Sequence, residues 1–367
     1  MIPTLQGWLE RRFSTVEAMT SIQAFERFRQ YLLTSGVSGA AMAIVRPGNV
    51  LWSTGVGRLS SGVEITAHTP FMLGSVSKVV TGTAILQLSE RGLLSLDEDI
   101  NRALPFEVHS PLGGQPITLR TLATHTSGII DRNPEYASPY VSGDPEQPLE
   151  DFLRSYLTPG GAEYDTQGNF QPAGQYSYSN IGIALAALAA EHRVERPFDR
   201  WCAATLFGPL GLQDTGWFLR DFVDPSRIAE PRDDEGHVLP HYGYPTYPDG
   251  QLRSSAADLG RFLGMVMAGG VWRDVEVVRR ETLRQMWTVQ HMGPREDQLL
   301  FWTRKQGLIG HVGGDDGVLS FLYFHPEREL GLVLLTNQQT AQAMALGRRL
   351  IHEVLLDSES IFSSLAR

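Results

Sequence analysis

The segments with β-strand character lie at the two ends of this chain, and the middle has the character of helices and loops. Near the C-terminus, residues 318–324 and 330–337 are apolar runs on either side of a four-residue turn, which predicts a hairpin. Near the N-terminus, residues 40–45 and 50–52 flank a Pro-Gly-Asn turn and predict two further strands. We therefore expect an α+β fold, with an antiparallel sheet flanked by helices, formed by both chain ends, and with an inserted mostly helical domain.

The change of pattern along the chain also predicts domain boundaries. We expect residues 1–94 plus 253–367 to form an α/β domain with the antiparallel sheet, residues 95–252 to form a helical insertion domain, and the active site to lie between them. Apolar residues spaced three and four apart predict helices near 15–34, 75–90, 118–125, 149–157, 180–192, 198–206, 256–267, 281–290 and 340–356.

Composition excludes several classes of function. A net charge of −10 argues against nucleic acid as the main partner. Cys202 is the only cysteine, so no internal disulfide and no cysteine-based metal cluster can form, and its apolar neighbours favour a small buried side chain over a reactive thiol. No stretch approaches 18 uninterrupted apolar residues and no signal peptide is recognisable, so we expect no membrane partner and a cytoplasmic location.

Ser75 and Lys78 form the first candidate catalytic element, Ser-x-x-Lys. If a helix begins at or just before Ser75, this spacing puts the hydroxyl and the amine on one face, about one turn apart. A lysine held there can activate the serine as a nucleophile, and free N–H groups at the helix start can stabilise an oxyanion. Taken alone, the same four residues fit a helix cap with a solvent-exposed lysine.

Tyr178 and Asn180 form the second element, in a short loop before a helix. A phenol beside a lysine ammonium can take the serine proton and later return it to a leaving group, and the amide can orient the lysine or a substrate carbonyl. The alternative is a tyrosine-rich turn with an Asn cap.

The third element is the predicted strand His311-Val312-Gly313-Gly314. A glycine-flanked strand with a free edge lets a substrate backbone approach closely and can supply a second oxyanion N–H. The alternative is an interior strand with a hydrogen-bonded histidine.

Together, in this order and at these separations, the three elements resemble the penicillin-recognising serine hydrolases. This superfamily holds class C β-lactamases, D-alanyl-D-alanine carboxypeptidases, family VIII carboxylesterases and related acyltransferases. The segment Leu122-Ala123-Thr124-His125-Thr126-Ser127-Gly128 is similar to the family's Leu-Leu-Thr-His-Thr-Ser-Gly, and Pro172-Ala173-Gly174 and Gly208-Pro209-Leu210-Gly211-Leu212 also match. The likeness extends from about residue 20 to 356.

The resemblance implies a role for each matched residue. Ser75 is implied to be the acylated nucleophile, Lys78 its proton acceptor or electrostatic partner, and Tyr178 the general base and acid. Asn180 is implied to orient the substrate, and His311, Gly313 and Gly314 to form the substrate-binding strand. The N–H groups of Ser75 and Gly314 would form the oxyanion hole. No role in catalysis is implied for His125, which we interpret as a structural histidine.

The third motif departs from the family's Lys-Thr-Gly, because His311 and Val312 stand where many members have lysine and threonine. A neutral histidine and a valine lose the charge and the hydroxyl that help to bind a substrate carboxylate. Arg253, Arg304 or Lys305 could compensate.

These considerations predict a serine hydrolase that forms a Ser75 acyl-enzyme with an ester or amide, most simply a carboxylesterase or an acyltransferase. The alternatives are a D-amino-acid-specific peptidase or DD-carboxypeptidase, a weak class C-like β-lactamase, or a catalytically silent binding module that is acylated. The expected partner is a small-molecule ester or amide, and no metal or organic cofactor is implied. The oligomeric state cannot be read from the sequence.

Two further features bear on the substrate. Asp315 and Asp316 directly follow the third motif and either attract a cationic group of the substrate or are solvated. Seven tyrosines in the segments 131–175 and 240–247 either line an acyl or leaving-group pocket or serve packing, namely Tyr136, Tyr140, Tyr156, Tyr164, Tyr242, Tyr244 and Tyr247.

Overall fold

The computed structural model describes residues 15–131, 139–293 and 296–357 of the chain. Its centre is a seven-stranded sheet in the order β10-β11-β12-β13-β14-β1-β2, in which every neighbouring pair is antiparallel. Its strands are β10 (Asp297–Gln298), β11 (Thr303–Lys305), β12 (Leu308–Asp315), β13 (Val318–His325), β14 (Leu330–Thr336), β1 (Gly39–Arg46) and β2 (Asn49–Gly57). Pairing of β14 with β1 joins the two chain ends, so the predicted fold class is confirmed.

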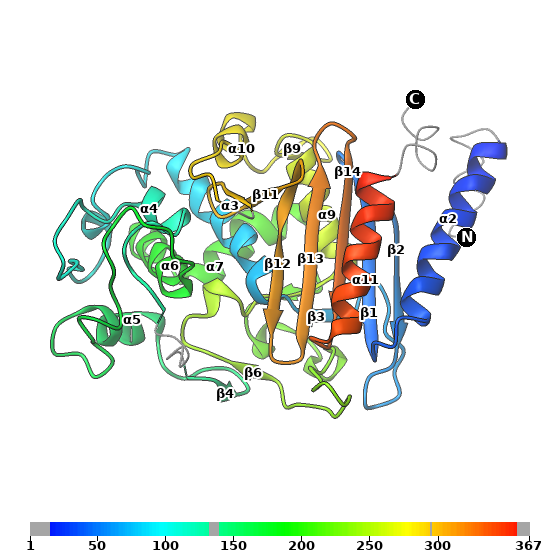
Figure 1. Cartoon of the computed structure of the whole chain (residues 1–367), viewed down its shortest axis with the longest axis horizontal. Coiled ribbons are helices and arrows are strands. Elements are labelled where there is room, and N and C mark those ends of the chain that lie inside the picture. Colours follow the sequence, from blue (N-terminus) through cyan, green and yellow to red (C-terminus); the bar gives the residue numbers. More distant parts are fainter. Residues whose placement is uncertain (1–14, 132–138, 294–295, 358–367) are drawn as a thin grey trace.

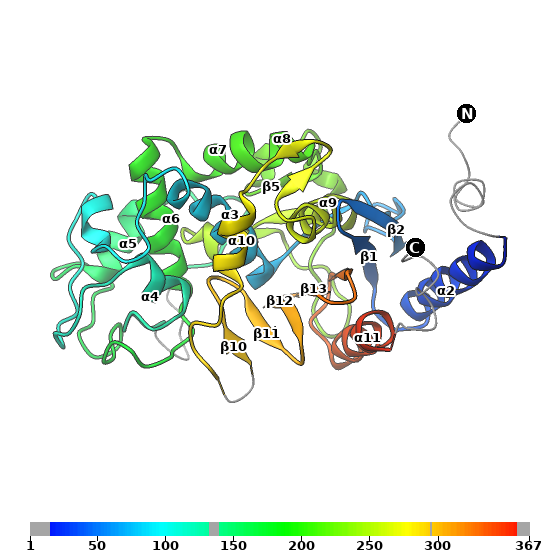
Figure 2. The ribbon, with the colours of Figure 1, turned by 90° about the horizontal axis from the view of Figure 1, so that it is seen from above.

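Helices cover both faces of this sheet (Figures 1 and 2). Successive residues of a strand point to opposite faces, and β1 follows this rule: Ala40, Met42 and Ile44 pack in the cluster that includes α2 (Thr15–Leu33) and α11 (Ala341–Ile351). Ala41 and Ala43 pack in the larger cluster with α3 (Ser77–Ser89) and α9 (Ala256–Met267). Because both faces are covered, β1 and β14 are apolar along almost their whole length rather than alternating.

The remaining helices lie mostly on the side of α3 away from α11 (Figure 1). The most buried is α6 (Asn180–Val194), whose residues 181–190 are all buried and which packs against α3. The other helices are α4 (Leu119–Ala123), α5 (Leu149–Leu157), α7 (Phe198–Cys202), α8 (Gly208–Leu210) and α10 (Arg280–Met286), and π-helical turns follow α7 and α11 at Ala203–Phe207 and His352–Leu356. Each predicted helix has a counterpart, although the domain boundaries at 94/95 and 252/253 stay a prediction.

Among the described residues, short strands in the loops around these helices form three small sheets. β3 (Pro70–Met72), β7 (Arg253–Ser255) and β5 (Thr215–Gly216) form a three-stranded sheet that leads the chain into Ser75. β4 (Val141–Ser142) pairs with β6 (Tyr242–Gly243), and β8 (Val271–Trp272) pairs with β9 (Val275–Glu276). The β4–β6 pair joins the segment before α5 to the segment before β7. Cys202 is buried, as predicted.

Candidate active site

Ser75 lies in a tight turn between β3 and α3. The turn is a 3-10 helix, Gly74–Val76, and the α-helix begins only at Ser77, two residues after Ser75. Gly74 has φ +52°, which a side chain rarely adopts, and this left-handed residue lets the chain leave β3 sharply. Ser75 is therefore presented on the turn, and Lys78 follows in the first turn of α3.

Lys78 is buried, with 1% of its surface exposed, because α3 is enclosed on all sides. Its Nζ donates to Ser75 Oγ (3.0 Å), Asn180 Oδ1 (2.6 Å) and the carbonyl oxygen of Asp249 (2.8 Å). An ammonium has three protons, so these three bonds satisfy it fully and fix its position. The structure thus brings Ser75, Lys78 and Asn180 together as the sequence predicts.

Tyr178 completes the group around the serine. Its hydroxyl lies 2.8 Å from Ser75 Oγ, and Lys78 Nζ lies 4.9 Å from the centre of its ring. The Tyr178 residue is 36% exposed, whereas Lys78 is enclosed, so the phenol is the member of the group nearest to solvent and to an entering substrate.

His125 packs against the loop that carries Tyr178. Its ring centre is 4.5 Å from that of Tyr178, and its Nδ1 accepts the backbone N–H of Ser179 (3.1 Å). Burial, followed by the charge of Lys78, lowers the pKa of His125 to about 3, so the ring is neutral at pH 7. These contacts agree with its interpretation as a structural histidine.

Asp131 is a site residue that the sequence did not reveal. Its carboxylate accepts the backbone N–H groups of Asn180 (2.7 Å) and Ile181 (3.1 Å) and the hydroxyl of Ser179 (3.0 Å). It thereby binds the free N–H groups at the start of α6 and fixes the loop that carries Tyr178. Burial raises the pKa of Asp131, and the three hydrogen bonds oppose that effect.

Asp249 is a second site residue that the sequence did not reveal. Its backbone oxygen holds Lys78, and its side chain is buried beneath the site. Burial raises the pKa of the Asp249 carboxyl to about 7, although the nearby charge of Lys78 acts in the opposite direction. A backbone acceptor has no sequence signature, so only the fold could identify this contact.

Strand β12 lies directly against the turn of Ser75. Its partner β11 pairs only with residues up to Gly310, so the half from His311 onward faces the turn instead. A Cβ placed on Gly313 would overlap the Leu73 carbonyl oxygen and come within 3.0 Å of the Ser75 nitrogen, and one on Gly74 would lie 3.0 Å from the Gly314 nitrogen. Glycines are therefore required for this close approach, and the predicted role of the strand in supplying an oxyanion N–H stays a prediction.

His311 faces the same group of residues. Its ring centre is 6.3 Å from that of Tyr178 and its Nδ1 lies 2.6 Å from the Val312 carbonyl oxygen. Burial and then the charge of Lys78 lower the pKa of His311 to about 4, so it carries no charge at pH 7. Val312 points away, toward Phe321 and Met344 beside α11. Of the two departures from Lys-Thr-Gly, His311 is therefore the one that changes the site.

The three cations considered as substitutes for the lysine have other contacts. Arg253 is buried and donates to the carbonyl oxygens of Trp217 and Tyr242, and Arg304 forms an ion pair with Asp297. Lys305 lines the cavity beside Phe321 and α11.

The predicted aromatic lining divides into two groups. Tyr140, Tyr242 and Tyr244 lie together, with the ring of Tyr140 5.3 Å from each of the other two. Tyr156 and Tyr247 belong to the core, and Tyr164 packs against Phe170. Tyr136 lies outside the described residues.

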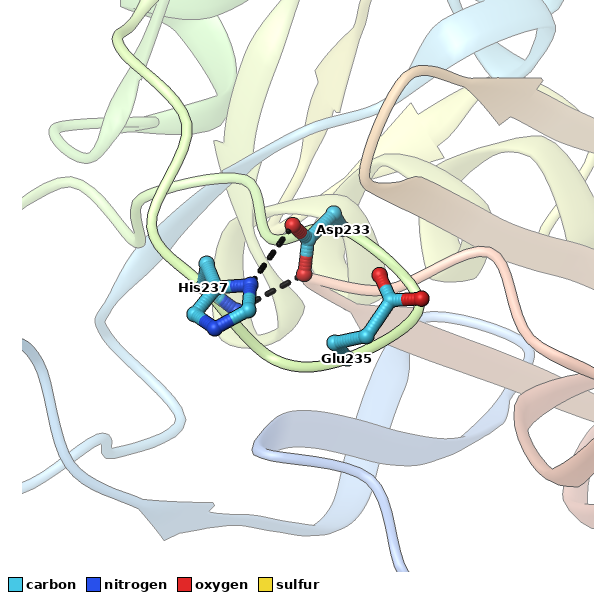
Figure 3. A group of neighbouring side chains, drawn as sticks. All are labelled: Asp233, Glu235 and His237. Atoms are coloured by element: carbon cyan, nitrogen blue, oxygen red, sulfur yellow. Dashed lines mark hydrogen bonds and ion pairs between the residues drawn. The ribbon is translucent and has the colours of Figure 1, made fainter.

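One loop brings together three potential metal ligands, Asp233, Glu235 and His237, whose ligand atoms lie within 4.8 Å of one another (Figure 3). Asp233 accepts the His237 backbone N–H (2.8 Å), and its other carboxylate oxygen is 3.0 Å from His237 Nδ1. Hydrogen bonds within the loop account for this arrangement without a metal ion.

No helix in the described ranges is both long and apolar enough to cross a bilayer.

Comparison with known proteins supports the resemblance. The chain is 27% identical over 255 residues to putative beta-lactamase-like 1 from Homo sapiens, which covers 66% of this chain and only 48% of the human protein. It is 28% identical over 335 residues to penicillin-binding protein 4 of Amycolatopsis lactamdurans, covering 85% of this chain and 84% of the relative. The fold matches a beta-lactamase/D-alanine carboxypeptidase from Pseudomonas syringae with a TM-score of 0.69 at 21% identity, over 88% of this chain and 98% of that one.

A family model described as Beta-lactamase matches residues 23–356, which include Ser75, Lys78, Tyr178 and the β12 strand. The chain therefore belongs to the β-lactamase family of serine hydrolases, together with the penicillin-binding proteins.

Proposed function

We propose that this protein is a carboxylesterase or an acyltransferase that works through an acyl-enzyme on Ser75. The observation that carries this proposal is the position of Ser75 Oγ, between Lys78 Nζ at 3.0 Å and the Tyr178 hydroxyl at 2.8 Å. A serine held by both groups can lose its proton as it attacks a carbonyl carbon.

The proposed reaction has two halves. Ser75 Oγ attacks the carbonyl carbon of the substrate, and its proton passes to the oxygen of Tyr178, which acts as the general base. Tyr178 then gives this proton to the leaving group as the bond to the carbonyl breaks. In the second half, water or an alcohol repeats the attack on the acyl-enzyme, with Tyr178 again as base and acid, and releases Ser75.

The backbone of the site would stabilise the oxyanion formed in each half. The N–H groups of Ser75 and Gly314 belong to the two segments that approach each other at Gly74 and Gly313. Lys78, fixed by three hydrogen bonds, would stabilise negative charge on the oxygens of Tyr178 and Ser75.

His311 supports an ester or acyl-transfer substrate over one with a required carboxylate. A neutral imidazole lacks the fixed charge that forms strong hydrogen bonds to a carboxylate. The second candidate is a D-amino-acid peptidase or weak β-lactamase, which is favoured by the relative named penicillin-binding protein and by the full Ser75, Lys78 and Tyr178 set.

Three probes separate these candidates: p-nitrophenyl butyrate, a penicillin and a D-alanyl-D-alanine peptide, each followed by product release and intact protein mass. We expect turnover of the ester, lost in Ser75→Ala and kept in Ser89→Ala, which removes a hydroxyl from the far end of the same helix. Release of D-alanine, or hydrolysis of the penicillin faster than of the ester, would favour the second candidate. A stable adduct without turnover would indicate the silent acylable module.

A further inference from the structure

The direction of β12 defines two sides of the site. His311 lies near Tyr178, and Tyr178 is the group that would protonate the leaving group. The leaving group therefore departs at the His311 end of the strand. The acyl group must then extend the other way, past Gly313 and Gly314 toward Asp315.

Asp315 is the last residue of β12, and tyrosines surround its carboxylate. One carboxylate oxygen accepts the hydroxyl of Tyr140 (2.8 Å) and the backbone N–H of Asp316 (2.9 Å), and the other lies 3.3 Å from the Tyr244 hydroxyl. The hydroxyl of Tyr242 donates to the backbone oxygen of Asp316, so a third tyrosine contacts the same end of β12. Because β-strand residues are spaced about 3.3 Å apart, the Asp315 backbone is about 7 Å from that of Gly313.

A second contact connects this carboxylate to the nucleophile. A Cβ on Gly250 would overlap the Tyr244 hydroxyl and would lie 3.6 Å from the carbonyl carbon of Gly74, the residue before Ser75. The Tyr244 hydroxyl is therefore close both to the Asp315 carboxylate and to Gly250, which lies against the turn that carries the serine. Tyr140 is 48% exposed, so the same group of residues also reaches the surface.

The charge of Asp315 has no cationic partner among the described residues, since no lysine, arginine or histidine there forms an ion pair with it. Burial raises the pKa of Asp315, whereas the hydrogen bonds from Tyr140 and the Asp316 backbone oppose that effect. A cation placed beside Asp315 would favour the carboxylate further. The aromatic rings also favour a cation, because a ring face attracts an ammonium group.

We infer that Asp315, with Tyr140 and Tyr244, selects substrates whose acyl group carries a positive charge a few bonds from the reacting carbonyl. This inference rests on the proposed function and names its substrate class: an ester or amide of a cationic acid, such as an amino or quaternary ammonium acid. The ammonium pairs with the Asp315 carboxylate while the carbonyl lies at Ser75.

Two esters of the same shape test this inference. The p-nitrophenyl esters of 4-(trimethylammonio)butanoic acid and 5,5-dimethylhexanoic acid differ only in a quaternary nitrogen against a quaternary carbon. We measure kcat/KM for both, each divided by its rate of uncatalysed hydrolysis. For the wild type we expect a ratio of at least ten in favour of the cationic ester.

Variants assign this preference to one carboxylate. Asp315→Asn should reduce the ratio at least tenfold, whereas Asp316→Asn, which removes an equal charge from the exposed neighbour, should leave it within twofold of the wild type. Asp315→Glu keeps the charge and should retain part of the preference, and thermal unfolding shows that each variant is folded. If Asp315→Asn fails to fold, a wild-type ratio of at least ten that is partly kept in Asp315→Glu supports the inference, and a ratio near one in the wild type overturns it.

A wild type that hydrolyses the neutral ester equally well or faster overturns the inference and leaves the proposed function intact. The same holds if Asp315→Asn folds and keeps the full preference. Absence of turnover and of Ser75 acylation with both esters overturns the proposed function, and the inference with it.

Discussion

Gly313→Ala adds a single methyl group at the contact between β12 and the turn of Ser75. In the structure this carbon would overlap the Leu73 carbonyl oxygen and the Ser320 hydroxyl, which are hydrogen-bonded to each other at 2.5 Å, and would lie 3.0 Å from the Ser75 nitrogen. Two of these neighbours are backbone atoms and cannot rotate away. The strand and the turn must therefore separate by on the order of 1 Å, a displacement that can lower a rate about 10²-fold.

The separation also moves the two N–H groups proposed for the oxyanion hole, and loss of one such donor costs about 10²–10³ in kcat. We therefore expect kcat for p-nitrophenyl butyrate to fall about 10²-fold or more. Forcing extra volume into this packed contact should also destabilise the fold by about 1–3 kcal/mol. Stopped-flow or steady-state release of p-nitrophenol gives the first quantity, and denaturant unfolding gives the second.

Gly182→Ala is the matched control. Gly182 is buried in α6, but a Cβ there would meet its nearest atoms at 3.4 Å or more, which is ordinary packing distance. An alanine inside a helix should stabilise it by about 0.5–1 kcal/mol. A kcat within twofold of the wild type and unchanged stability in Gly313→Ala would show that the close approach of β12 to the turn is not required.

Four further outcomes follow from the site. Tyr178→Phe should lower kcat about 10²–10⁴-fold while leaving the fold intact, as checked by p-nitrophenyl ester turnover and circular dichroism. Asp131→Ala should reduce stability by about 1 kcal/mol, because the N–H groups of Asn180 and Ile181 at the start of α6 lose their acceptor, and it should lower kcat as well, because Asp131 fixes the Tyr178 loop. The folded Asp249 carboxyl, with a pKa of about 7, keeps a proton that the unfolded chain releases near pH 4, so its contribution to stability falls as the pH rises from about 4 to 7. The Tm of Asp249→Asn relative to the wild type should therefore be higher at pH 8 than at pH 5. His311→Lys should raise the rate of acylation by a penicillin about tenfold or more, and His311→Gln should not, because only lysine restores a fixed charge for the carboxylate.

The residues that could be predicted from the sequence are those that occur in short motifs. Ser75 and Lys78 are three residues apart on one turn, and Tyr178 and Asn180 share one loop, so each pair is placed by local geometry. The assembly of the two pairs followed from the family resemblance, and the structure places them within hydrogen-bond distance.

The contacts that could not be predicted join distant segments. Asp131 binds the start of α6 from about 50 positions earlier in the chain, and Asp249 holds Lys78 through a backbone atom 171 positions away. Neither has a motif. The orientation of Val312 toward α11 could not be predicted either. Alternation along a strand assigns side chains to two faces, but it does not say which face lies at the active site.

Trapping of the acyl-enzyme shows directly whether Ser75 is the nucleophile. The wild type and Ser75→Ala are mixed with p-nitrophenyl butyrate, quenched in acid within milliseconds to seconds, and digested for peptide mass mapping. We expect a butyryl mass increase on the peptide that contains Ser75, fragmentation that places it on that serine, and no such species in Ser75→Ala. Butyryl transfer to another residue, or ester turnover that persists in Ser75→Ala, would contradict it.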